Sequence, residues 1–215
     1  MVRRTDAAGS VSELRVLAEK VNQVFVRKAA LRPVPRHAAI DEVAIAQVEE
    51  QLGDEGDALQ RTLDEAYREM DRRQPALASW LAEQVAARND EIAQSLGYFL
   101  VVTVYMAFRE AFPTRLDAVD EAQLKLAIDT LAADEELRAN DPSEVLESDD
   151  LVMMTQPVVL HFVQHHLDQA IEQAGDEPDL EAFDHVYRAI LVEVISLSHA
   201  VRAPDGSPAN EDVLA

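Results

Sequence analysis

Four side chains of metal-ligating type follow one another at helical spacing near residue 165. Intervals of four, three and four residues place them within about 60° on one helix face, at about 100° per residue: His161, His165, Asp168 and Glu172. Imidazole and carboxylate groups at this spacing are typical zinc ligands. The apolar residues of the segment fall on the opposite side, however, and a functional metal site needs support from a second element. We therefore interpret the stripe as a solvent-facing surface and predict no metal site.

A single carboxylate, Glu193, interrupts an otherwise apolar run from residue 189 to residue 195. If this run is buried, the carboxylate must be paired, hydrogen-bonded or protonated, and buried acids are enriched at functional sites. The structural alternative places Glu193 at the edge of the core or bonds it to a polar side chain such as Tyr105, Arg109 or His199. We favour the structural alternative and leave the functional one open.

The remaining candidates for chemistry are few. Five aromatic residues could line a pocket between helices, although aromatic residues at helical spacing are more typical of a core: Trp80, Tyr98, Phe99, Tyr105 and Phe108. His185 follows Glu181 by one turn, which is most simply a surface pair. Phosphate-loop, G-x-S-x-G, H-E-x-x-H and di-iron E-x-x-H motifs do not occur, and the chain has no cysteine. We predict no catalytic residue and no cofactor.

The elements that must position these residues are helices. Gly is scarce, and Ala, Leu, Glu, Gln and Arg, which favour helices, dominate the long segments. We predict an all-α fold, a helical bundle of about five to seven helices. The expected helices include segments near 38–52, 57–73 and 119–138. A bundle helix without a polar face, such as residues 96–108, belongs in the middle of the bundle.

Two segments of the bundle resemble each other. Gln74-Pro75 and Gln156-Pro157 each open a helix, and each is followed by a second helix that is apolar all round and stops before a proline. We expect Asn89 to cap the second helix of the first segment and Thr155 to cap the first helix of the second. The sequence thus predicts two pseudo-repeated hairpins, at about 74–113 and 156–204, whose apolar helices (96–108 and 189–201) pack together. The later copy would contain eight extra residues.

The chain divides into three regions by composition and charge. Residues 1–36 form a basic amphipathic helix and a proline linker. The helix has a coiled-coil-like apolar stripe at Leu14, Leu17, Val21, Val24 and Leu31. Residues 37–204 form the acidic bundle, and residues 205–215 read as a disordered tail. Within a net charge of −22, residues 1–40 carry eight basic and three acidic residues, and residues 41–215 carry 11 basic and 38 acidic residues.

This charge distribution makes nucleic-acid or membrane binding by the body unfavourable. The longest apolar run, residues 96–108, is shorter than the roughly 20 residues of a membrane span, and no signal-peptide pattern follows Met1. We therefore expect a cytoplasmic, non-catalytic interaction or regulatory protein that binds a protein partner or self-associates through its N-terminal helix, as a homo-oligomer. Two alternatives stay open: a one-component helical transcription regulator with a ligand-binding body, and an enzyme that uses an inter-helix pocket.

Overall fold

The structure, a computed structural model, describes residues 34–53, 56–140, 152, 155–175 and 178–204. These residues form a short 3₁₀ turn and seven α-helices: η1 (Arg36–Ala38), α2 (Glu42–Gln51), α3 (Asp57–Arg73), α4 (Pro75–Ala86), α5 (Glu91–Ala111), α6 (Glu121–Asn140), α8 (Pro157–Gln173) and α9 (Leu180–Ala200). Within these ranges the only β-type pairing is an isolated bridge between Leu116 and Val201. The all-α prediction and the expected number of helices are confirmed.

The chain groups into two compact units. One contains residues 33–129 and 149–215, which form the bundle discussed below, and the other contains residues 1–32 and 130–148. Of the second unit the structure describes only the C-terminal half of α6. The predicted basic helix before residue 34 and the predicted tail after residue 204 lie outside the described residues.

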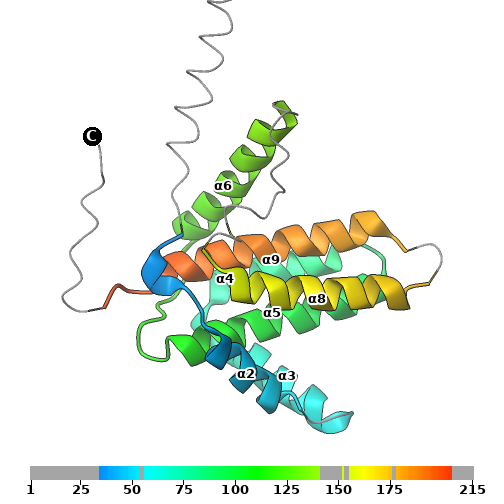
Figure 1. The fold of residues 1–215 in the computed structure, drawn as a ribbon, viewed down its shortest axis with the longest axis horizontal. Helices are drawn as coiled ribbons and strands as arrows, with labels where there is room; N and C mark the ends of the chain where they lie inside the picture. The colour runs from blue at the N-terminus through cyan, green and yellow to red at the C-terminus, as the bar shows by residue number, and fades with distance from the viewer. Residues whose placement is uncertain (1–33, 54–55, 141–151, 153–154, 176–177, 205–215) are drawn as a thin grey trace, which may run out of the picture. The chain divides into compact units, whose positions relative to one another are not determined.

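Helices α5 and α9 form the centre of the bundle. Helix α5 contacts α2, α3, α4, α8 and α9, and α9 also contacts α4 and α8 (Figure 1). Every residue from Leu100 to Phe108 and from Ala189 to Ser198 is buried, which confirms that the two apolar segments pack together. Helix α5 is long and apolar enough to cross a membrane by length and composition alone. Since 67% of that window is buried inside the protein, α5 has the burial of a core helix.

A glycine allows three of these helices to approach closely. A Cβ atom added to Gly97 on α5 would lie 3.1 Å and 3.2 Å from the two γ-carbons of Val85 on α4, and 3.3 Å from Cγ1 of Val186 on α9. Such distances are tighter than ordinary van der Waals contacts, so a larger residue would require the side chains of Val85 and Val186 to shift by a few tenths of an ångström. Glycine at position 97 therefore favours the close approach of α4, α5 and α9.

The helices α5 and α9 begin in the same way. The side chains of Asp90 and Asp179 accept hydrogen bonds from the backbone N–H groups of Ala93 (2.7 Å) and Ala182 (3.1 Å) and so cap α5 and α9. The expected cap at Asn89 is therefore wrong by one residue. The caps are 89 positions apart (179 − 90), whereas the Gln-Pro pairs are 82 apart (156 − 74), so the difference is seven residues and not eight.

Gln74 and Gln156 are buried residues that precede α4 and α8. Their backbone angles are nearly the same, with φ −131° and ψ 53° at Gln74 and φ −130° and ψ 50° at Gln156. Gln156, and not Thr155, is the N-cap residue of α8, and the Thr155 hydroxyl donates instead to the carbonyl of Val152 (3.2 Å). The expected side-chain cap at Thr155 is therefore wrong.

Each glutamine amide bridges a backbone segment that is distant in sequence. Gln74 Nε2 donates to the Asp117 carbonyl (2.9 Å) and its Oε1 accepts from the Val119 N–H (2.7 Å). Gln156 Nε2 donates to the Ala38 carbonyl (2.6 Å) and its Oε1 accepts from the Ile40 N–H (2.9 Å). Each amide therefore pairs with a carbonyl and an N–H two residues apart. We call these two arrangements the glutamine clamps. The duplication of a hairpin, which would explain them, stays a hypothesis.

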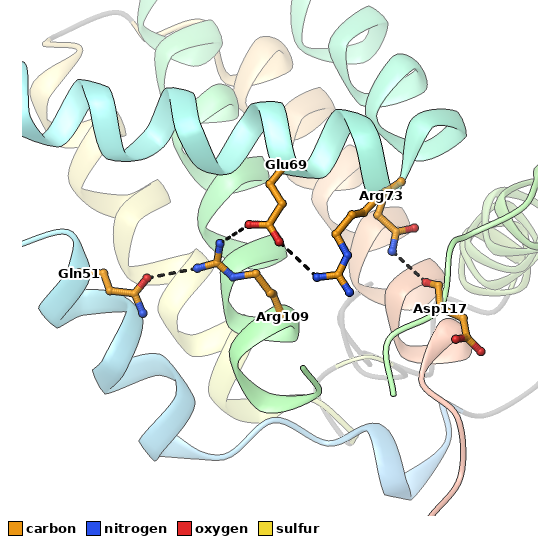
Figure 2. A network of polar contacts seen from close by, with 6 residues as sticks. Gln51, Glu69, Arg73, Arg109 and Asp117 are labelled. Carbon is orange, nitrogen blue, oxygen red and sulfur yellow. Dashed lines mark hydrogen bonds and ion pairs between the residues drawn. The ribbon is translucent and has the colours of Figure 1, made fainter. Parts of the chain in front are cut away.

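A second polar network fixes the other end of α2 (Figure 2). Glu69 on α3 accepts hydrogen bonds from Arg109 on α5 (2.7 Å) and from Arg73 (3.2 Å), and Arg109 also donates to Gln51, the last residue of α2 (3.2 Å). Burial raises the pKa of the Glu69 carboxyl, but the bonds from both arginines outweigh it and the pKa is lowered overall. Helix α2 is thus anchored near its N-terminus by the clamp of Gln156 and at its C-terminus by Arg109.

Candidate functional site

An open groove of about 770 Å³ lies between α2 and α8. Its residues come from two turns of α2 and from the first half of α8: Glu42, Ile45, Ala46, Glu49, Pro157, Val158, His161, Phe162 and His165. Ile45 and Phe162 are nearly buried, at 9% and 8% exposure, whereas Ala46 and both carboxylates are exposed. The groove therefore has an apolar floor and a polar rim, which is the general form of a protein-binding surface.

The charge of this groove has one sign. Neither α2 (EVAIAQVEEQ) nor α8 (PVVLHFVQHHLDQAIEQ) contains a lysine or an arginine. Glu42 and Glu49 lie in the groove itself, and Glu50, Asp168 and Glu172 add further exposed carboxylates on the two helices. The two helices thus lack the cations that would neutralise these acids locally, so the electrostatic potential at the groove is negative.

The predicted histidine and carboxylate stripe lies on the outside of α8. The side chains of His161, His165, Asp168 and Glu172 are all exposed, which confirms the solvent-facing interpretation. The Nε2 atom of His165 lies 3.1 Å from the Nε2 atom of Gln169, one turn later on the same helix. Among the described residues no three His, Asp or Glu side chains are grouped as metal ligands. The two histidines of the stripe instead contribute to the rim of the groove between α2 and α8.

His166 is a residue that the sequence analysis missed. Its half-buried ring lies between two phenylalanines, with ring centroids 5.0 Å from Phe99 on α5 and 4.5 Å from Phe162 on α8. Burial lowers the pKa of His166, and the neighbouring His165 lowers it further, while Glu49 acts in the opposite direction. The contact between His166 and Phe162 could have been predicted, because the two residues are one helical turn apart on α8. The contact of His166 with Phe99 on α5 was not predictable, because the two residues are 67 positions apart in the sequence.

Glu193 differs from both structural alternatives expected from the sequence. Its side chain is fully buried, at 0% exposure, so it does not lie at the edge of the core. Among the residues that the structure describes, neither of its carboxylate oxygens has a hydrogen-bond partner, so it is not bonded to Tyr105, Arg109 or His199. Burial raises the pKa of Glu193 well above its ordinary value, because the charged form has lost its water. Burial therefore favours the protonated form of Glu193 in the folded protein.

Two further polar groups of the core share this lack of partners. The hydroxyl groups of Tyr105 on α5 and Ser196 on α9 are buried and accept or donate no hydrogen bond within the described part of the chain. Burial raises the pKa of Tyr105, and the charge of Glu69 raises it further. Ser196 lies one turn beyond Glu193 on the same helix. Neither Glu193 nor Tyr105 lines one of the three pockets described for this structure.

A pocket of about 620 Å³ opens between α3, α4 and α5. Of the five aromatic candidates, Tyr98 and Phe99 line it, while Tyr105 and Phe108 are core residues with 0% exposure and Trp80 is half-buried outside it. The Tyr98 hydroxyl donates to Asp64 (2.9 Å), and its ring lies 5.7 Å from the ring of Tyr67. Burial, followed by the bond to Asp64, raises the pKa of Tyr98. This pocket is the second candidate site.

His185 lies away from both sites. Its Nε2 is 3.1 Å from the carbonyl oxygen of Gln84 on α4, and with Glu181 it lines a smaller pocket of about 390 Å³ at the start of α9. The interaction recorded for His185 is thus with the backbone of α4. We assign it to the packing of α9 on α4.

Comparisons with family models, with curated proteins and with solved structures found no significant match for this chain.

Proposed function

We propose that the protein is a non-catalytic, intracellular interaction protein, and that the groove between α2 and α8 binds amphipathic helices with basic flanks. The observation that carries the proposal is the combination of an apolar floor with two walls that contain no lysine or arginine. A helix that offers an apolar stripe to Ile45 and Phe162 would place flanking cations beside Glu42 and Glu49. This is the helix-in-groove mode of recognition, in which apolar anchors supply affinity and charges supply selectivity.

A labelled synthetic peptide tests this proposal. We expect a leucine/lysine peptide with leucines at 3-4 spacing to bind the full-length protein, as measured by fluorescence anisotropy, and a leucine/glutamate peptide of the same pattern not to bind. Glu49→Lys should weaken binding about five- to thirtyfold, since it replaces an attraction by a repulsion. Glu50→Lys is the matched control: Glu50 is the next residue, is equally exposed and does not line the groove, so its effect should stay below about twofold.

The two variants carry the same net charge, which makes the comparison decisive. If Glu49→Lys and Glu50→Lys weaken binding equally, the peptide responds to the overall acidity of the protein and the groove is not its site.

A second candidate function is small-molecule binding in the pocket between α3, α4 and α5, as a ligand-binding regulator or an enzyme would require. The observation in its favour is the volume of about 620 Å³, which falls within the range of small-molecule sites. A ligand of this pocket should raise the melting temperature in a thermal-shift screen. Ala82→Trp, which fills the pocket, should abolish the shift, whereas Glu83→Trp, at an exposed position outside it, should preserve it.

A further inference from the structure

We infer that the occupant of the groove is residues 10–32 of a second copy of the chain, so that two chains exchange these segments and form a closed dimer. The inference rests on the proposed function, because it names the partner of the same groove. The two surfaces would be exchanged reciprocally, which is the condition for a twofold assembly that closes on itself.

The first argument is chemical complementarity. Residues 10–32 carry five basic residues (Arg15, Lys20, Arg27, Lys28 and Arg32) and two acidic ones (Glu13 and Glu19), a net charge of +3. Leu14, Leu17, Val21 and Val24 provide an apolar stripe along the same segment. The groove offers the reverse, an apolar floor between walls that contain carboxylates and no cations. The segment therefore has both features that the groove selects for.

The second argument is length. The groove residues of α8 extend from Pro157 to His165, which corresponds to about 12 Å at a rise of about 1.5 Å per residue. Leu14 to Val24 spans ten residues, or about 15 Å as a helix. Three or four successive stripe residues therefore match the length of the apolar floor.

The third argument is the place where the segment joins the bundle. Val34 is 2% exposed, and residues 38–40 are held by Gln156, whose neighbour Pro157 lines the groove. The chain thus enters the bundle beside one end of the groove. The residue before a proline is restricted to extended backbone, and Pro35 imposes this on Val34. The mixing experiment below distinguishes insertion into a second copy from a reversal onto the same one.

Disulfide trapping tests the inference. The chain contains no cysteine, so every disulfide must form between the introduced residues. In the full-length protein, Val21→Cys combined with Ala46→Cys should give a disulfide-linked dimer under mild oxidation, at about ten times the yield of Val21→Cys combined with Gln47→Cys. Ala46 and Gln47 are adjacent and exposed, and only Ala46 lines the groove. Mixing a chain that carries only Val21→Cys with one that carries only Ala46→Cys should give the same dimer.

Two results would overturn the inference: a yield no higher than that of the Gln47→Cys control, or a disulfide formed within one chain. Light scattering provides an independent measurement. Val21→Asp should convert the dimer to a monomer while the helical content seen by circular dichroism is kept, and Asn22→Asp should leave the dimer intact.

The peptide assay separates this inference from the proposed function. If the leucine/lysine peptide binds in a manner that depends on Glu49 but no cross-linked dimer forms, the groove binds helices and the second copy is not its occupant. If the peptide also fails to bind, both the inference and the proposed function are wrong.

Discussion

Gln74 and Gln156 each bond to a backbone segment that precedes a distant helix. Gln74 bonds to Asp117 and Val119, ahead of α6, while Gln156 bonds to Ala38 and Ile40, ahead of α2. In both cases the bridged segment leads directly into a helix capped by an aspartate: Asp41 accepts from Ala44 N–H, and Asp120 accepts from Gln123 N–H. The two clamps therefore fix the segments that precede α6 and α2.

Loss of a glutamine clamp should destabilise the whole bundle. In Gln156→Ala, the Ala38 carbonyl and the Ile40 N–H lose their partner inside the protein, which should cost about 2–4 kcal/mol because unsatisfied buried groups cost about 1–3 kcal/mol each. Gln74→Ala should cost a similar amount. Urea denaturation measures both, and Gln47→Ala, an exposed residue, should change the stability by less than about 0.5 kcal/mol. A similarly small change in Gln156→Ala would show that the clamp is dispensable.

Glu193 should make the protein less stable as the pH rises. Its pKa is raised in the folded state, so the folded form holds a proton that the unfolded form releases above about pH 4.5. The contribution of Glu193 is therefore complete below that pH and is lost as the pH rises toward the folded-state pKa, by up to about 1.4 kcal/mol per pH unit. Glu193→Gln replaces the protonated carboxyl group by a neutral group of similar shape that does not titrate, so this loss of stability with rising pH should disappear.

The measurement is the difference in unfolding free energy between Glu193→Gln and wild type at pH 5, 6, 7 and 8. We expect the variant to gain on the wild type as the pH rises, because all other titrating groups cancel in the difference. The exposed substitution Glu91→Gln should show no such trend. A difference that is constant across these pH values would mean that Glu193 is ionised and stabilised in the native protein.

His166 should show the opposite pH dependence. Its pKa is lowered by burial between Phe99 and Phe162, so its contribution to stability is present above about pH 6.5, the ordinary value, and is lost as the pH falls through the folded-state pKa. In a histidine NMR titration, the resonance that disappears in His166→Gln should have its midpoint below 6.5. A midpoint at or above 6.5 would show that the ring is open to water.

Enlarging Gly97 should separate α4, α5 and α9. Gly97→Leu forces a side chain against Val85 and Val186 and should cost about 1–3 kcal/mol. Val85→Ala, which removes the nearest atoms, should recover part of this loss in the double variant. Thermal unfolding followed by circular dichroism measures the three proteins, with Ala87→Leu at an exposed helix end as the control. If the double variant were no more stable than Gly97→Leu, the contact with Val85 would not be the cause.

The helix boundaries that depend on local sequence signals were predictable. Helix α3 spans residues 57–73 as expected, and prolines 75 and 157 mark the first residues of α4 and α8. Gly175, at φ 90°, follows α8, because a glycine takes this conformation without strain. The caps were harder, because Asn89 and Asp90 are adjacent and both are favourable cap residues.

The candidate site was not predictable to the same degree. The exposure of His161 and His165 followed from helical periodicity, but the groove beside them needs α2, more than 100 residues earlier in the chain. The partners of Gln74 and Gln156 are likewise 43 and 118 positions away. A weak signal did exist, since Ala39-Ile40-Asp41-Glu42 resembles Ala118-Val119-Asp120-Glu121. For Glu193 the expectation failed because its carboxylate is fully buried and has no hydrogen-bond partner among the described residues.

The clamp of Gln156 also has a consequence for synthesis in the cell. The Ile40 N–H leaves the ribosome 116 residues before the amide that pairs with it, and at about 5–20 residues per second this delay is roughly 6–23 s. During that interval the Ala38 carbonyl and the Ile40 N–H lack the amide to which they bond in the folded protein. Slow codons placed before residue 156 should therefore lower the yield of folded protein more than the same codons placed after it.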